Sequence, residues 1–449
     1  MTMAIMAILS GSMLCGAPDG GWRAGTARVD ITPDGPIWLA GYASRDHEAA
    51  EVLHPLWVKA LALEDAQGRK GLLITSDHLG FPKELSKRIR DRIQESLGLE
   101  RAQVILSASH THSAPVLYGS LMCIYPMQDA QLAKVKAYAA QLEDDVAAAA
   151  EAAFANLKPA QVRSGAGVCR FAVNRRNNNE GAILETHNFA GPVDHSVPVI
   201  EVAEPGGEAM ALVFGYACHC TVLSGYQICG DYAGFAQVAL EEAYPGANAM
   251  FFAGCGADQN PLPRRSVYLA RQYGEELAAA VRRALGDTMQ PLEPELRTAY
   301  TETTLYLNDP PSREELEAVA ESETGYKREA AKDLLEILGR GEPLRTSYPY
   351  PVQAWRLGGQ DLFVLGGEVV VDYAVFIKKL FGADTFVMGY ANDVMSYIPS
   401  VRVLEEGGYE GDTSQIIYGM PAKWREDIEE RVMAAVREVA EEAGIAASE

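Results

Sequence analysis

The 449-residue sequence is poor in positive charge. It has 39 Lys and Arg residues against 61 Asp and Glu residues, which gives a formal net charge of −22 at pH 7. An acidic chain is repelled by phosphate backbones and by anionic membrane surfaces, so neither is expected as a general partner. The sequence also lacks a Walker loop, a GxSxG nucleophile elbow and a periodic DNA-reading helix. These absences set aside nucleotide-binding, serine α/β-hydrolase and DNA-binding functions.

Cysteine is scarce and irregularly placed. The seven cysteines form no CxxC pair, so neither a disulfide framework nor a zinc ribbon is indicated. The cluster Cys218-His219-Cys220 has metal-binding residue types at close spacing. Adjacent residues on a strand point to opposite faces, however, so these three side chains are not expected to share one ion.

Long apolar segments are also absent. The run over residues 3–14 is too short to span a bilayer, and no other segment is a better candidate. With Cys15-Gly16-Ala17 after it, the run is similar to an export signal, although no Lys or Arg precedes it. We interpret residues 1–20 as a signal-like or disordered N-terminus. An export signal favours a secreted or periplasmic bacterial protein. The alternative is a cytoplasmic protein in which this segment is a disordered tail.

What is present is an alternation of strand and helix patterns. Strands are predicted at 25–33, 37–43, 57–64, 71–76, 103–106, 211–217, 249–253, 360–365 and 385–389, and helices at 83–97, 131–157, 234–244 and 266–285. This order predicts an α/β fold in which mixed β-sheets are covered by helices. We predict one catalytic domain over residues 21–420 with a helical insert at 310–340, followed by an amphipathic helix within 421–449.

Polar side chains follow several of these strands. His110 and His112 come after the apolar run 103–106, and two residues at i and i+2 on an extended backbone point to the same side. His219 and Glu368 end two further buried strands. Ligands bind at the carboxyl ends of strands in open α/β sheets. Two neutral imidazoles and a carboxylate are a suitable set for a catalytic zinc with an open position, whereas each residue alone could be structural.

These residues also carry a family resemblance. The chain resembles the catalytic N-terminal domain of the neutral/alkaline (non-lysosomal) ceramidases, which are zinc amidohydrolases. The matching segments are ARVDITP at 27–33, AGY at 40–42, SHTHS at 109–113, ACH at 217–219, GADQNP at 256–261, GGE at 366–368, and Tyr397.

The resemblance implies a neutral-ceramidase-like fold and a Zn²⁺ cofactor. It implies that zinc is bound by His110, His219, Glu368 and Tyr397, and that His112 assists at the scissile carbonyl. Arg175 and Arg176 both lie near the family's Asn-Arg element. The sequence does not decide between them, and Arg176 is our candidate for the catalytic set.

One departure affects the expected chemistry. Asn260 stands where the family has an essential serine, and an amide can donate a hydrogen bond but cannot act as a nucleophile. We therefore expect metal-bound water to attack the amide of an N-acyl or ceramide-like substrate directly. His112, Tyr397, Asn260 and Arg176 would surround the reacting carbonyl. We also expect no counterpart of the family's additional C-terminal β-domain, which leaves ceramide itself open as the substrate.

Two other hypotheses remain. Because of Asn260, the chain could be a non-catalytic homologue, or one that acts on an ester or a polar substrate. An amidohydrolase-type barrel would also use a His-x-His pair, but that pair usually lies on the first strand, and at least three predicted strands precede His110. The expected partner of the enzyme is a small-molecule or lipid-like acyl-amide, and the oligomeric state is not predicted.

Overall fold

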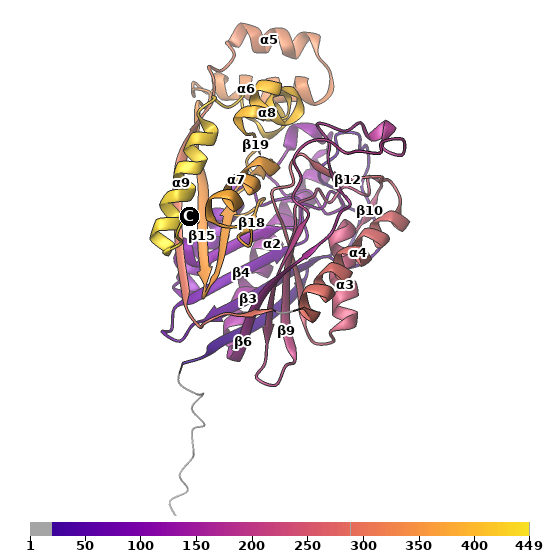
Figure 1. Ribbon diagram of the computed structural model, residues 1–449. Helices are drawn as coiled ribbons and strands as arrows, with labels where there is room; N and C mark the ends of the chain where they lie inside the picture. Colours follow the sequence, from indigo (N-terminus) through magenta and orange to yellow (C-terminus); the bar gives the residue numbers. More distant parts are fainter. Residues whose placement is uncertain (1–19, 288, 449) are drawn as a thin grey trace, which may run out of the picture.

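The centre of the molecule is a mixed β-sheet of nine strands (Figure 1). The computed structural model describes residues 20–287 and 289–448. The strand order is β11-β9-β8-β6-β1-β3-β4-β5, with β13 paired to β6. The pairs β4–β5 and β9–β11 are parallel, and the other pairs are antiparallel. The strands are β1 (Trp22–Asp30), β3 (Trp57–Glu64), β4 (Lys70–Ser76), β5 (Val104–Ala108), β6 (Lys158–Val168), β8 (Ser196–Ala203), β9 (Ala209–Tyr216), β11 (Asn248–Ala253) and β13 (Gln290–Pro291).

A second sheet packs against one face of the first. Its order is β14-β15-β16-β18, with β14 (Leu296–Tyr306), β15 (Ser347–Leu357), β16 (Gln360–Leu365) and β18 (Phe386–Met388). Alternate residues of the large sheet, such as Leu61 and Ile105, share a buried apolar cluster with Trp355 and Leu362 of the second sheet. Burial of this apolar surface holds the two sheets together. Three short strand pairs complete the β-structure: β2 (Glu51–Val52) with β10 (Gln227–Ile228), β7 (Ala172–Asn174) with β12 (Gln259–Pro261), and β17 (Glu368–Val369) with β19 (Tyr397–Ile398).

Helices cover the outer faces of both sheets (Figure 1). On the large sheet these are α1 (Lys83–Leu97), α2 (Asp129–Ala155), α3 (Asp231–Ala243) and α4 (Val267–Gly286); on the second sheet they are α7 (Val371–Phe381) and α9 (Ile428–Ala443). The remaining helices are α5 (Arg313–Ser322), α6 (Gly325–Gly339) and α8 (Val401–Glu406), and the short helical turns are η1 (Arg101–Gln103), η2 (Met122–Ile124), η3 (Glu180–Ala182), η4 (Tyr409–Thr413) and η5 (Gln415–Tyr418). The predicted α/β fold with mixed sheets covered by helices is confirmed.

Several predicted elements differ from those observed. The predicted strand at 37–43 is wrong, because Ile37 and Leu39 form only isolated bridges, to Ala49 and Pro115. The long strands β6, β8, β14 and β15 were not predicted, since strands such as β14 (LRTAYTETTLY) have little apolar alternation. Within the predicted helical insert at 310–340 the structure has two helices, α5 and α6.

Two further predictions concern the N-terminal segment and membrane-spanning helices. The predicted signal-like or disordered N-terminus lies outside the described residues, apart from Gly20. Within residues 20–287 and 289–448, no helix combines the length and apolarity needed to cross a bilayer.

The segment after β18 links the two edge strands of the large sheet. The backbone N–H of Gly389 donates to the carbonyl of Ala253 at the end of β11, at 2.9 Å. Three residues later, the N–H of Asn392 donates to Leu106 of β5 at 2.6 Å. These bonds bring the carboxyl ends of β5 and β11 to one place, where the histidine-bearing loops also lie.

Candidate metal centre and its surroundings

Three imidazoles and one carboxylate meet in a buried cluster. His110 Nε2 lies 3.2 Å from His112 Nε2 and 3.3 Å from Glu368 Oε2. The same Glu368 oxygen lies 3.1 Å from His219 Nε2. The ligand atoms of the three histidines lie within 4.8 Å of one another. The structure therefore brings together three of the four residues that the sequence suggested as ligands, His110, His219 and Glu368, and His112 lies beside them.

The two histidines of the SHTHS segment meet for a reason other than the predicted one. His110 follows β5 in the left-handed region, with φ 58°, so the backbone is not extended there. For a non-glycine residue this conformation costs on the order of 1–3 kcal/mol, and such strain concentrates at functional sites. The two rings still face each other, with their centroids 4.9 Å apart.

Gly41 makes room for the second histidine. It has φ 91°, and a Cβ atom at this position would lie 2.2 Å from Nδ1 of His112. The ring of Tyr42 packs against the same imidazole at 4.9 Å. The AGY segment thus forms the wall behind His112.

Backbone carbonyls determine the tautomers of two histidines. Nδ1 of His110 donates to the carbonyl of Leu79 at 2.6 Å, and Nδ1 of His219 donates to Gly256 at 2.8 Å. A carbonyl only accepts, so each Nδ1 carries the proton and each Nε2 presents a lone pair to the cluster. This anchoring is usual for metal-binding histidines. His112 differs, because its buried Nδ1 has no partner among the described residues.

Burial favours the neutral form of His219 and His112. It lowers the pKa of His219 to about 4, with the positive charge of Arg175 as a further cause. Burial, together with His110, lowers the pKa of His112 well below 6.5. For Glu368, burial alone would raise the pKa, but His110 and His219 outweigh it and hold the pKa well below 4.5. A neutral His219 beside an ionised Glu368 is in the protonation state that a divalent ion needs of its ligands.

The donor set is of a kind that could hold a metal ion such as zinc. In a tetrahedral site with bonds of about 2.0–2.1 Å, neighbouring ligand atoms lie roughly 3.3 Å apart. Among the proposed ligands, Glu368 Oε2 lies 3.3 Å from His110 Nε2 and 3.1 Å from His219 Nε2, while the ligand atoms of the three histidines lie within 4.8 Å of one another. Nitrogen and carboxylate oxygen donors are also the types that zinc takes in catalytic sites.

Tyr397 and Arg175 extend the cluster on one side. The Tyr397 hydroxyl lies 3.4 Å from His219 Nε2 and accepts a hydrogen bond from Arg175 Nη2 at 3.1 Å. Arg175 Nη1 also reaches Oδ1 of Asn260, at 3.4 Å. Asn260 is buried on β12, which pairs with β7 just before Arg175. Tyr397 therefore contacts the cluster directly, whereas Asn260 is connected to it through Arg175.

Arg176 does not lie where the sequence analysis placed it. Its guanidinium forms ion pairs with Glu410 at 2.6 Å and with Glu406 at 3.0 Å. The neighbouring Arg175 is the residue that contacts Tyr397 and Asn260. Successive side chains point in different directions, and sequence spacing alone could not tell which of the two faces inward.

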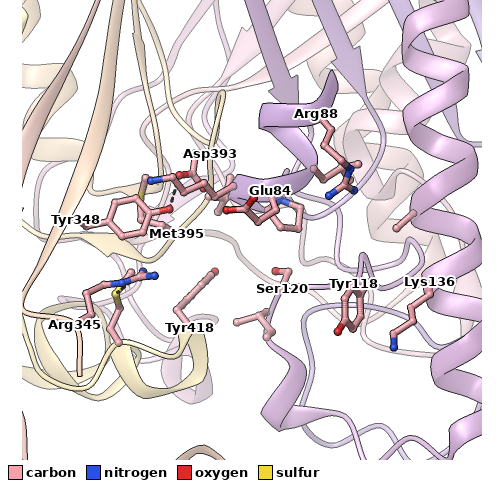
Figure 2. A pocket seen from close by; sticks show the side chains of 18 of the residues that line it. Glu84, Arg88, Tyr118, Ser120, Lys136, Arg345, Tyr348, Asp393, Met395 and Tyr418 are labelled. Atoms are coloured by element: carbon pink, nitrogen blue, oxygen red, sulfur yellow. Dashed lines mark hydrogen bonds between the residues drawn. The ribbon is translucent and has the colours of Figure 1, made fainter. Parts of the chain in front are cut away.

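Tyr418, which is not predicted from the sequence, also contacts the cluster. Its hydroxyl donates to Oε1 of Glu368, which orients the carboxylate from the side opposite the histidines' contacts with Oε2. Tyr418 lies on η5, which carries no recognisable motif. The same side chain lines a cavity of about 550 Å³, where Figure 2 shows it between Arg345 and Ser120. The cavity wall includes Met395 and the cation of Lys136, but none of the three clustered histidines.

A second cavity, of about 530 Å³, lies on the Arg175 side of the cluster. Arg175, Asn260 and Tyr409 all line it. Tyr409 is 46% exposed, and its ring packs edge-on against Tyr397 at 5.3 Å. This cavity, which we call the Tyr409 cavity, gives solvent a way to the polar residues that border the histidines.

The fold and the buried histidine cluster agree with one class of protein. The family model "Neutral/alkaline non-lysosomal ceramidase, N-terminal" matches residues 22–290, more than half of the chain. The chain therefore belongs to this family, as the motifs indicated.

Individual relatives match parts of the chain. A neutral ceramidase of Drosophila melanogaster is 29% identical over 116 residues, which are 25% of this chain and 16% of the relative. Neutral ceramidase B of Dictyostelium discoideum is 23% identical over 242 residues, 51% of this chain and 33% of the relative. These matches span at most a third of the curated relatives.

Two solved structures share the fold. Neutral ceramidase from Pseudomonas aeruginosa superimposes with a TM-score of 0.74 at 20% identity, covering 96% of this chain and 76% of that one. A ceramidase complexed with C2 gives a TM-score of 0.71 at 19% identity, covering 96% and 77%. At these identities the likeness concerns the fold.

Proposed function

We propose that this protein is a zinc-dependent hydrolase that cleaves the amide bond of an N-acyl substrate. The observation that carries the proposal is that Glu368 Oε2 lies 3.3 Å from His110 Nε2 and 3.1 Å from His219 Nε2, with His112 beside them. The family of the chain supports the reaction class, since its named members are ceramidases.

His110, His219 and Glu368 would hold the ion, with Tyr397 as a fourth candidate next to His219. The backbone carbonyls on His110 and His219 support this assignment, because they fix Nε2 as the free donor atom. A bound zinc ion supplies a Lewis acid for the substrate carbonyl and lowers the pKa of water from about 15.7 to near 7.

His112 would transfer the proton. It lacks the carbonyl anchor of the other two histidines, and its side chain is only partly buried. An imidazole whose Nδ1 is not committed to the backbone can accept and release a proton at Nε2. Arg175 and Tyr397 would stabilise the developing oxyanion, and removal of one such donor typically costs on the order of 3 kcal/mol of barrier.

Metal analysis combined with a substrate panel tests the proposal. We expect about one zinc per chain after gentle purification, together with hydrolysis of at least one N-acyl amide that chelation abolishes and added zinc restores. A metal-free protein that zinc does not activate would contradict it.

Asn260 supports one alternative function, a homologue that binds a ligand without hydrolysing it. An asparagine at the position of the family serine motivates this hypothesis. It requires that Asn260→Ser creates an activity that the parent lacks. Turnover of any N-acyl amide by the parent enzyme would exclude it.

A further inference from the structure

The wall of the Tyr409 cavity is polar. Charged and amide side chains make up most of it, and within the described part of the chain Leu262 is its one aliphatic side chain. A hydrocarbon chain gains about 0.8 kcal/mol per CH₂ only where it is buried against apolar surface. Long alkyl chains would find little such surface here.

The charges on this wall neutralise each other. Arg175 pairs with Glu410 at 2.7 Å, and Arg176 contacts both Glu410 and Glu406. Arg264 donates to Glu180 at 2.8 Å on another part of the wall. Paired charges leave no strong preference for an ionic ligand. They still offer many hydrogen-bond donors and acceptors, so an uncharged ligand with several hydroxyl groups fits this wall.

Two side chains are available to such a ligand. Tyr409 presents a half-exposed ring, and the guanidinium carbon of Arg175 lies 5.6 Å from the ring centroid. Asn260 uses Oδ1 for Arg175, whereas its Nδ2 makes no hydrogen bond to the described residues. An aromatic face beside an amide donor can bind a saturated ring that has C–H groups on one face and hydroxyls at its edge.

We propose that the Tyr409 cavity binds a hydroxyl-rich sugar ring, so that the substrate belongs to the N-acylated amino sugars. This inference rests on the proposed amide hydrolysis. Arg175 of the wall contacts Tyr397, and Tyr397 in turn contacts His219 of the cluster. The cavity can therefore hold the part of the substrate next to the scissile bond.

Matched substrates test the inference. The substrates are glucosamine and cyclohexylamine, each N-acylated with either an acetyl or a hexanoyl group. The two amines have rings of similar size, but only glucosamine carries hydroxyl groups on its ring. We expect kcat/KM to be about a hundredfold or more higher for the sugar, since a site built for hydroxyls rejects a ligand without them. Equal rates, or a preference for the cyclohexyl amide or for ceramide, would overturn the inference while the proposed hydrolase function stands.

Variants locate the site. Tyr409→Ala is expected to lower kcat/KM for the sugar substrate about tenfold or more, with a much smaller effect on the cyclohexyl amide. Tyr409→Phe keeps the ring and should retain most of the activity. Tyr268, which is 74% exposed on α4, provides the control variant Tyr268→Ala. Equal losses for both substrates would contradict a sugar-binding role.

A binding measurement separates the two proposals. Saturation-transfer NMR with N-acetylglucosamine should show ring protons in contact with the wild-type protein, and Tyr409→Ala should abolish the signal. If none of the amides is hydrolysed, the proposed function fails, and a Tyr409-dependent NMR signal still supports the sugar site. Absence of that signal from the wild-type protein would overturn the sugar site.

Discussion

Glu368 Oε2 lies 3.1 Å from His219 Nε2, across 149 residues of sequence. Glu368 is on β17 of a short strand pair, and His219 follows β9 of the large sheet. Glu368 and His219 lie close together because the two sheets pack against each other and because the segment 389–392 is hydrogen-bonded to both β5 and β11. The proposed metal site is thus a product of the whole fold rather than of one loop.

Removal of one proposed ligand should remove the metal. His219→Ala leaves Glu368 Oε2 without one of its two imidazole neighbours, and we expect the zinc content to fall from about one per chain to near zero. Elemental analysis measures this, and circular dichroism checks that the fold is kept. His187→Ala, at an exposed histidine, is the control. Full zinc content in His219→Ala would contradict the assignment.

Loss of the Tyr418 hydroxyl should weaken metal binding without abolishing it. The hydroxyl donates to Oε1 of Glu368, and groups that orient a ligand typically contribute 10–100-fold to metal affinity. We therefore expect Tyr418→Phe to raise the Kd for zinc by about that factor, as measured by competition with a chelator. Tyr268→Phe should leave the Kd unchanged. An unaltered Kd in Tyr418→Phe would show that the contact does not matter for the metal.

Gly41→Ala should slow catalysis while metal binding persists. The new Cβ would lie 2.2 Å from Nδ1 of His112 and must displace that ring, and its three nearest atoms all belong to His112. A shift of about 1 Å in a catalytic group can cost on the order of a hundredfold in rate. We expect kcat to fall by about that factor at normal zinc content.

Gly68→Ala is the matched control for this prediction. Gly68 also has positive φ, at 78°, but a Cβ there has no atom within 4 Å. The backbone cost of about 1 kcal/mol should therefore be similar in the two variants, and only Gly41→Ala should lose activity. Equal activities would mean that His112 is not needed in its present position.

The stability of the protein should depend on pH through Asp393. Burial raises the pKa of this carboxyl from 3.8 to about 6, against the opposing hydrogen bond from Tyr348. Between about pH 4 and pH 6 the folded state therefore binds more protons than the unfolded state. The contribution of Asp393 to the free energy of unfolding falls as the pH rises through this range.

Asp393→Asn should remove this dependence. Relative to the wild type, the free energy of unfolding of the variant should rise by up to about 3 kcal/mol between pH 4 and pH 7. Urea unfolding at several pH values measures the difference. Asp384→Asn, at an exposed position, should run parallel to the wild type. A constant difference between Asp393→Asn and the wild type would rule out this contribution.

Local patterns predicted much of the secondary structure. The helix at 83–97 matches α1 because its apolar residues repeat at helical spacing, and the apolar strand at 57–64 matches β3, which is buried on both faces. The polar residues at strand ends pointed to His110, His219 and Glu368, and the structure brings these three together. Long strands with mixed composition, such as β14, have no clear period and were missed.

The sequence by itself determined which residue types could bind a metal and which segments form most of the framework. The tertiary structure alone decided that Arg175 rather than Arg176 faces the cluster, that Tyr418 contacts Glu368, and that His110 turns through a left-handed conformation. The physical reason is that periodicity reports which face of an element is buried. It does not report which distant surface packs there, and the direction of a single side chain depends on that packing.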